Sequence, residues 1–165
     1  MKTEIEKKFI RCGRRREWLY QNQQIALRPR EYNSHISYLD GALSMIFDIM
    51  QVKDRRVAGE LALRLGEGPG IFYLGHVGYH IDPPFRGHSY AFQACSLCLP
   101  VFQELDWHSF VITTDEDNLA SIRTCERLGC VLECTVDVPD WCRAEYQISA
   151  RKRRYVYQQK AELDF

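Results

Sequence analysis

The residues best suited to chemistry in this sequence follow an apolar run and open a helix, in the segment Arg86–Ala91 (Arg-Gly-His-Ser-Tyr-Ala). The Pro83–Pro84 pair cannot donate to a strand ladder, so the predicted strand that reaches Ile81 must end there. The first turn of a helix presents unpaired N–H groups and the positive end of the helix dipole, which together suit phosphate oxygens. Gly87 would let a phosphate approach the backbone closely, and Arg86 adds a cationic fork. The segment therefore predicts a phosphate-binding loop.

A second candidate segment, Asn118–Gly129 (Asn-Leu-Ala-Ser-Ile-Arg-Thr-Cys-Glu-Arg-Leu-Gly), lies one predicted strand further along the chain. Its acidic start, with Asp117 or Asn118 as the N-cap, and its closing glycine indicate a helix. By the i, i+3 and i+4 rule, Asn118, Ser121 and Cys125 fall on one stripe of that helix. We therefore expect the Ser121 hydroxyl and the Cys125 thiol to face the same bound group.

Together, the two segments resemble the Gcn5-related N-acetyltransferases, the GNAT superfamily. Arg86–Ala91 looks like the family's Arg/Gln-x-x-Gly-x-Gly/Ala loop, with Ser89 in place of the second glycine. Asn118–Gly129 is similar to the family's Asn-x-x-Ala/Ser-x-x-x-Tyr-Glu-Lys-x-Gly segment. With Ser121 and Arg123, it looks most like the branch that includes ribosomal-protein N-terminal acetyltransferases.

The resemblance implies a mixed α/β fold, whose central sheet is mostly antiparallel and contains one splayed pair of parallel strands. It also implies acetyl-CoA as co-substrate, without a metal, with the diphosphate on the loop and the pantetheine arm along the first splayed strand. An amine acceptor, either a small molecule or a protein N-terminus, would attack the thioester directly. The cofactor-binding residues carried over in this way are Tyr79, His80, Ile81, Arg86, Gly87, His88, Ser89, Tyr90, Ala91, Asn118 and Ser121.

The resemblance leaves the acid and the base of the reaction open. Cys125 stands where the family often has the tyrosine that protonates the leaving thiolate, and Ser121 is the second candidate for that role. His76, His80 and Glu60, on neighbouring predicted strands, are candidates for the base. His76 and His80 would stand ~13 Å apart on a strand, which argues against a shared metal ion.

In chain order the sequence predicts strands and helices that fit a GNAT fold. Residues 1–24 are expected to be a charged, solvated segment with one short strand or helix, and Arg151–Arg154 a solvated turn before the last strand. A hairpin is expected from the apolar alternation of its two strands, and the strands on either side of the first long helix should be parallel. The expected strands are Ile25–Arg28, Leu43–Val52, Val57–Leu65, a run ending at Ile81, Ser109–Thr114, Cys130–Val138 and Arg153–Lys160, and the helices are Ser89–Asp106 and a second one ending at Gly129.

The connection between the first two predicted strands is short. The first ends near Arg30 and the second begins near Leu43, which leaves about a dozen residues. GNAT proteins usually place two helices there, and a dozen residues cannot hold two helices of normal length. These helices should be missing or very short, and the acceptor face of the cleft should be open.

The composition of the chain restricts the number of domains and the class of binding partner. The 165 residues suit a single domain, with 45% hydrophobic and 27% charged residues as in ordinary globular proteins. Lys+Arg and Asp+Glu both number 22, so no overall charge favours a nucleic acid or a membrane. Without an export signal, the 7 cysteines fit reduced thiols in a cytoplasmic protein. A non-catalytic CoA-binding or sensory domain stays open as the alternative, as does a homodimer.

Overall fold

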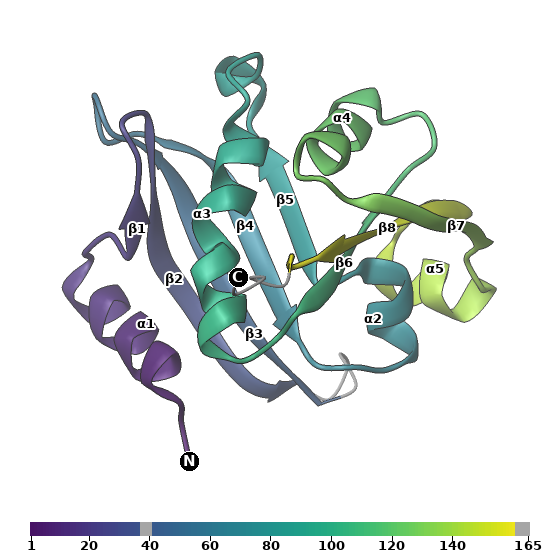
Figure 1. Cartoon of the computed structure of the whole chain (residues 1–165), viewed down its shortest axis with the longest axis horizontal. Helices are drawn as coiled ribbons and strands as arrows, with labels where there is room; N and C mark the ends of the chain where they lie inside the picture. The colour runs from purple at the N-terminus through teal and green to yellow at the C-terminus, as the bar shows by residue number, and fades with distance from the viewer. Residues whose placement is uncertain (37–40, 161–165) are drawn as a thin grey trace, which may run out of the picture.

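The fold is that of a computed structural model, which describes residues 1–36 and 41–160. Within these residues the chain forms a five-stranded antiparallel sheet in the order β1-β2-β3-β4-β5 and a three-stranded antiparallel sheet in the order β6-β8-β7 (Figure 1). The mixed α/β class and the mostly antiparallel sheet are thereby confirmed. The strands are β1 (Tyr20–Gln21), β2 (Ile25–Ile36), β3 (Ala42–Gln51), β4 (Val57–Leu65), β5 (Val77–Ile81), β6 (Ser109–Thr114), β7 (Val131–Asp137) and β8 (Arg151–Gln158).

The helices lie against these sheets in two groups. α1 and α3 pack on one face of the larger sheet, whereas α2 and α5 lie beside the smaller sheet (Figure 1). None of the helices in the described part of the chain is long and apolar enough to span a membrane. Their bounds are α1 (Glu4–Arg15), α2 (Pro69–Leu74), the 3₁₀ turn η2 (Pro83–Phe85), α3 (Tyr90–Glu104), α4 (Leu119–Arg127) and α5 (Asp140–Tyr146).

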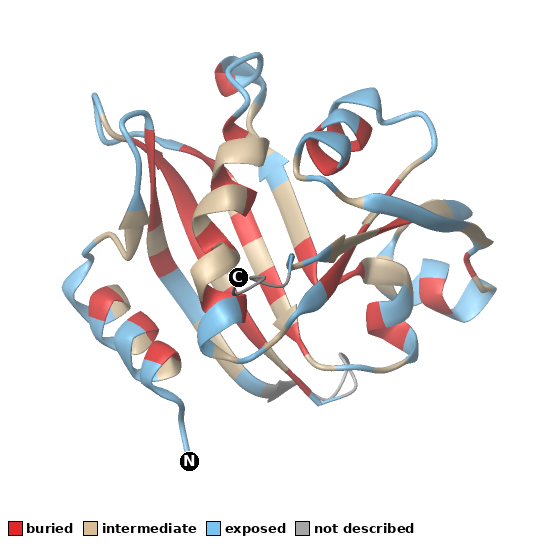
Figure 2. Ribbon diagram, in the orientation of Figure 1, coloured by how far each residue is buried: buried red, intermediate tan, exposed pale blue. Residues whose placement is uncertain are grey.

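The N-terminal segment is more ordered than the sequence suggested. A capping box between Thr3 and Glu6 starts α1, and the helix buries Ile5, Phe9 and Cys12 at the spacing of one helical face. Phe9 meets Phe47 of β3 edge to face, with 5.0 Å between ring centroids. Figure 2 shows these buried positions on a helix whose other residues are exposed or intermediate. The expectation of a solvated segment was wrong because α1 packs one apolar face against the sheet while most of its charged side chains stay exposed.

The connection between β2 and β3 is even shorter than expected. β2 extends to Ile36 and β3 begins at Ala42, so only residues 37–41 join the two antiparallel strands. These residues are too few for two helices, which confirms that the two family helices are missing here. A register shift next to Arg30 bends β2 without ending it, because the ladder resumes at the Glu31–Ile46 pair.

β5 and β6 are joined at one end and separate along their length. Gly75 forms an isolated bridge with Ile112, and the His76 N–H donates to the Val111 carbonyl at 2.7 Å. Beyond this point, no ladder pairs β5 with β6 in the described residues. In Figure 1 the two ribbons run in similar directions and diverge, as expected for a parallel, splayed pair.

The basic run near the C-terminus belongs to a strand, contrary to the expected turn. β8 begins at Arg151 and pairs with both β6 and β7. Arg154 is buried, with its guanidinium carbon 3.8 Å from the centroid of the Phe72 ring and its Nε donating to Glu133 at 2.8 Å. Stacking on an aromatic ring and pairing with a carboxylate let an arginine occupy a buried strand position.

Candidate active site

Two adjoining hollows form a cleft around the splayed strands. The loop hollow, of about 550 Å³, lies between the segment that joins β5 to α3 and the helix α4. The sheet hollow, of about 330 Å³, lies between β4, β5 and β6. Both are lined by Tyr79, His80, Asn118 and Ser121, so these residues mark the junction of the cleft.

The backbone of the loop hollow is held in a glycine-like conformation at two places. Gly87 has φ +90° and Ser89 has φ +59°, both in the left-handed region. Ser89, which stands where the family loop has its second glycine, thus has a left-handed conformation that glycine adopts most readily. A Cβ at Gly87 would meet nothing within 4 Å, so the space beside this glycine is open. α3 begins directly after Ser89 and directs its first N–H groups toward the hollow.

Three arginines line the loop hollow. Arg86 donates from Nε to the Ile81 carbonyl at 2.9 Å, and Arg127 donates to Ser89 Oγ at 2.8 Å. Arg123, one helical turn before Arg127, lines the same space. None of the described residues that line it is acidic, so the hollow suits an anion.

Two of these arginines were missed by the sequence analysis, although both stand in the second motif. Arg123 and Arg127 are four residues apart on α4, and that spacing alone indicates a shared helical face. His88, by contrast, was expected at the cofactor and does not line either hollow. Its ring stacks on Tyr90 at 5.3 Å, and Tyr90 itself lines the loop hollow.

The free edge of β5 faces the cleft. The Asp82 N–H donates to the Ala58 carbonyl, and the His76 carbonyl accepts from the Arg64 N–H. The backbone groups of the even-numbered residues along β5 therefore form the hydrogen bonds with β4. Ladder hydrogen bonds fall on alternate residues of an antiparallel pair. The N–H and C=O groups of Tyr79 and the N–H group of Ile81 therefore point away from β4, toward the gap between β5 and β6, whereas the Ile81 carbonyl accepts from Arg86 Nε.

At the junction, hydroxyl groups from β5 and α4 meet. The Tyr79 hydroxyl lies 2.7 Å from Ser121 Oγ, and Asn118 caps α4 by accepting the Ser121 N–H at 3.2 Å. Burial raises the pKa of Tyr79 far above its ordinary value, so the phenol stays protonated. Cys125 contacts the Tyr79 hydroxyl but is fully buried and lines neither hollow. Burial raises the pKa of its thiol to about 12.

His76 holds the point at which β5 and β6 meet. Its Nδ1 accepts the Val111 N–H at 2.9 Å, so the neutral ring carries its proton on Nε2, 3.1 Å from a Glu67 oxygen. Burial lowers the pKa of His76, although Glu67 opposes this shift. With both ring nitrogens occupied, and the ring edge-on to Trp107 at 5.2 Å, His76 has the contacts of a structural residue.

A row of charged side chains crosses the sheet face opposite α3. Asp48 of β3 and Glu60 of β4 are register partners, and Glu60 is in turn the partner of His80. Phe47 and Leu61, one residue away on the same strands, are buried in the core, so the charged row must face the other way. In this row the exposed fractions of the His80 and Glu60 side chains are 63% and 43%.

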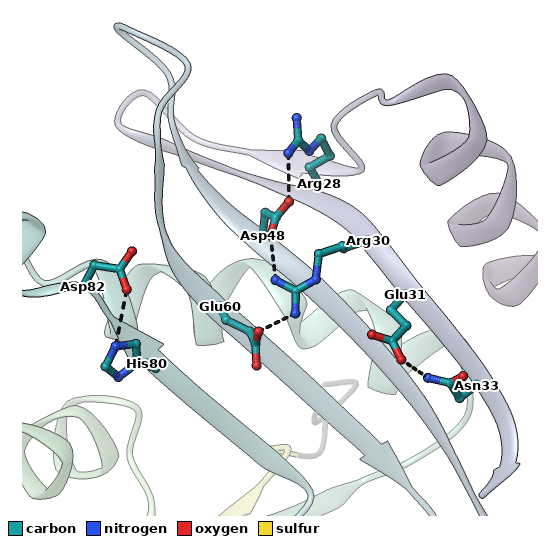
Figure 3. A network of polar contacts seen from close by, with 8 residues as sticks. All are labelled: Arg28, Arg30, Glu31, Asn33, Asp48, Glu60, His80 and Asp82. Atoms are coloured by element: carbon teal, nitrogen blue, oxygen red, sulfur yellow. Dashed lines mark hydrogen bonds and ion pairs between the residues drawn. The ribbon is translucent and has the colours of Figure 1, made fainter.

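Ion pairs hold this row in place (Figure 3). Asp48 binds Arg28 at 2.8 Å and Arg30 at 2.9 Å, and Arg30 also binds Glu60. His80 Nε2 lies 3.3 Å from an Asp82 oxygen. Of the candidate bases, His80 and Glu60 thus lie side by side at the cleft, on a sheet face that no helix of residues 1–36 and 41–160 covers, whereas His76 lies apart from them.

The fold is similar to that of several solved acetyltransferases. A GNAT-family acetyltransferase from Bacillus anthracis has a TM-score of 0.54 at 18% identity, over 68% of this chain and 65% of that one. RimL, a ribosomal L7/L12 alpha-N-protein acetyltransferase, has a TM-score of 0.55 at 23% identity, over 72% of each chain. The microcin C7 self-immunity acetyltransferase MccE, in complex with acetyl-CoA and AMP, has a TM-score of 0.55 at 19% identity, over 70% of this chain and 61% of that one. Two of these alignments thus span less than two thirds of the other chain.

Sequence comparison gives the family. No curated protein sequence matches the chain. Residues 14–131 match the family described as the acetyltransferase (GNAT) domain, a stretch that runs from the end of α1 to the start of β7 and contains both motifs. This match covers more than half of the chain and includes the loop hollow and the splayed strands. The chain belongs to the GNAT acetyltransferase family.

Proposed function

We propose that this protein is an N-acetyltransferase that transfers the acetyl group of acetyl-CoA directly to an amine. One observation carries the proposal. The loop hollow, which is cationic and lies at the start of α3, joins the polar, open sheet hollow at a junction beside the splayed strands β5 and β6. The first hollow suits the phosphates of CoA, and the second gives an acceptor access to the thioester. The structurally similar MccE was solved in complex with acetyl-CoA, which supports this assignment of the first hollow.

The cofactor is proposed to lie along β5. Its diphosphate would accept hydrogen bonds from the backbone of Gly87–Ala91, with Arg86, Arg123 and Arg127 around it. The amides of the pantetheine arm would pair with the N–H and C=O groups that β5 directs into the cleft, like an added strand. This path brings the thioester to the junction.

His80 is the proposed base. It lines both hollows, its side chain is exposed, and Asp82 lies within ion-pairing distance of its ring. Glu60 lines only the sheet hollow, where Arg30 holds its carboxylate, so it is better placed to bind the acceptor's positive charge. The amine would lose its proton to His80 and then attack the thioester carbonyl, so that an N–C bond forms and the C–S bond breaks.

The acceptor is proposed to be bulky, such as a protein N-terminus. The five residues 37–41 that join β2 to β3 leave no room for the two helices that roof this site in other GNAT proteins. The acceptor face accordingly presents the charged row of β2–β5 to the outside (Figure 3). The structural similarity to RimL, a ribosomal L7/L12 alpha-N-protein acetyltransferase, also supports a protein N-terminus as the acceptor.

Calorimetry and a turnover screen test the proposal. Acetyl-CoA should bind the wild-type protein, and Gly87→Glu should abolish binding because a carboxylate would fill and repel the phosphate site. Free-thiol release should then be followed over peptide N-termini, polyamines, aminoglycosides and amino acids. Unchanged affinity in Gly87→Glu would refute the cofactor site, and binding without turnover of any amine would leave a non-catalytic CoA-binding domain.

The role of His80 has a matched control within the chain. His108 is another exposed histidine paired with an aspartate two residues away, Asp106, at 3.1 Å. His80→Gln should lower kcat/KM for the amine on the order of 100-fold, whereas His108→Gln should leave it unchanged. Equal effects of the two substitutions would exclude His80 as the base.

A further inference from the structure

A third hollow, here called the aromatic hollow, adjoins the acceptor side of the cleft. It measures about 510 Å³ and lies between α2 and α5, which are neighbours beside the smaller sheet (Figure 1). Tyr73 lines both the aromatic hollow and the sheet hollow, so the two spaces share one wall. The walls consist mainly of aromatic rings and prolines with one acidic side chain, namely Phe72, Tyr73, Trp141, Pro69, Pro139 and Glu67.

The rings of the aromatic hollow are exposed and yet held in place. Phe72 is 41% exposed and Trp141 is 48% exposed. Tyr73 lies between them, edge-on to both, with ring centroids 4.9 Å from Phe72 and 6.3 Å from Trp141. The backbone below the rings is tied to the smaller sheet, because the Phe72 carbonyl accepts from Arg154 and the Tyr73 carbonyl accepts from Thr113 at 2.8 Å. Fixed, exposed aromatic rings around a hollow indicate a binding surface.

The charge of the aromatic hollow favours a cation. Its acidic side chain, Glu67, is 81% exposed, and one of its oxygens lies 3.1 Å from His76 Nε2. Arg154, which stacks on Phe72, is buried and paired with Glu133, and no described lysine or arginine lines the hollow. A carboxylate beside aromatic faces attracts an ammonium or a guanidinium group, and a tryptophan ring binds cations best of the three aromatic types.

We propose that the aromatic hollow binds a positively charged side chain of the acceptor, so that protein N-termini with an arginine or lysine near the amine are preferred. This inference rests on the proposed function, which places the amine beside His80. From His80 back to His76, β5 spans ~13 Å, and Tyr73 lies beyond that end of the strand. An extended acceptor chain advances ~3.3 Å per residue, so the cation should stand about three to five residues after the amine.

A peptide series tests the charge and the position of the preferred side chain. Hexapeptides with an N-terminal alanine and a glycine–serine background carry arginine, citrulline or norleucine at each later position in turn. Citrulline has the shape of arginine without its charge, and arginine avoids the second reactive amine of lysine. At one position among the third to fifth residues, kcat/KM should be about 10-fold higher with arginine than with citrulline. Equal values at every position, or norleucine equal to arginine, would overturn the proposal.

Variants of the hollow test whether it is the source of the preference. Trp141→Ala and Glu67→Gln should each reduce the preference for arginine over citrulline to about twofold or less. The matched controls are Val131→Ala, an exposed apolar side chain of β7, and Glu104→Gln, an exposed carboxylate at the end of α3. Neither of them lines one of the three hollows, so both should keep the full preference. An unchanged preference in Trp141→Ala would refute the assignment to this hollow.

Tryptophan fluorescence gives a second test that does not depend on turnover. Trp18 and Trp107 are partly buried, so a peptide bound in the aromatic hollow should act mainly on the emission of Trp141. Without acetyl-CoA, the arginine peptide should change the emission more strongly than the citrulline peptide, and Trp141→Phe should remove this change. The same change in Trp141→Phe as in the wild type, or no change in the wild type, would refute the hollow as the site. Arginine-specific binding without turnover of any peptide would instead refute the proposed function and leave the cation site in place.

Discussion

His76 is the residue whose replacement should best separate structure from catalysis. His76→Ala leaves the buried Val111 N–H without its acceptor, which costs about 1–3 kcal/mol. It also removes the edge-on contact with Trp107, worth about 0.5–1.5 kcal/mol. We therefore expect the free energy of unfolding to fall by about 1.5–4.5 kcal/mol. His76→Asn should recover much of the first part, because an amide oxygen can take the position of Nδ1.

The pH dependence of stability follows from the direction of the pKa shift. Burial lowers the pKa of His76 in the folded protein below the unfolded value of ~6.5. Between these two pKa values the unfolded chain binds a proton that the folded chain does not, so stability is lost as the pH falls below ~6.5. The loss approaches about 1.4 kcal/mol per pH unit and stops at the folded-state pKa. In His76→Asn this contribution should be absent.

Urea unfolding of the wild type, His76→Ala and His76→Asn, at several values between about pH 8 and about pH 5, measures both effects, with acetyl-CoA turnover recorded in parallel. If His76 is structural, His76→Asn should retain most of the turnover at neutral pH. A variant that stays as stable as the wild type but loses the acidic limb of its rate profile would show that His76 is the base, and our reading of its hydrogen bonds would be wrong.

Two further predictions concern the loop hollow and the N-terminal helix α1. Arg127→Ala should weaken acetyl-CoA binding about tenfold in calorimetry at low salt, and less at high salt, because the hollow loses one cation; an equal loss for desulfo-CoA would confirm that the phosphates are involved. Phe9→Ala should lower the free energy of unfolding by about 3–5 kcal/mol in urea, because Phe9 is only 2% exposed. Its KM for the amine should not change, since α1 covers the sheet face opposite the acceptor; a raised amine KM with unchanged stability would contradict this placement.

Much of the fold followed from local patterns in the sequence. The β3–β4 hairpin came from apolar residues on alternate positions, and the turn from β5 into α3 came from proline and glycine, whose backbone limits are local. α1 was missed although Ile5, Phe9 and Cys12 have helical spacing, because the surrounding charges hid three apolar positions. The burial of Arg154 could not be predicted, since it depends on Phe72, which is far away in the sequence.

The candidate site likewise has one part that the sequence predicts and another part that depends on tertiary packing. The loop residues could be named from one continuous segment, because the phosphate site is built from consecutive backbone groups. The contact between Tyr79 and Ser121 joins two elements that no sequence period relates, so only the packing of α4 against β5 reveals it. The structural role of His76 was hidden for a similar reason: its partners, Val111 and Glu67, lie on other elements.

Consecutive residues of β5 lie on opposite faces of the sheet, which makes the register of this strand important for the candidate site. Because side chains alternate across a strand, Tyr79 contacts Ser121 of α4 while His80 lies on the face proposed to receive the acceptor, and a slip of one residue would exchange them. Gly59, the register partner of Ile81, allows the close approach that this pairing needs, since a Cβ there would lie 2.1 Å from the His80 carbonyl oxygen. At the other end of the strand, His76 ties β5 to β6. The two ends are thus fixed independently, which leaves the middle of β5 as an open edge along which a pantetheine arm can pair without disturbing either side chain.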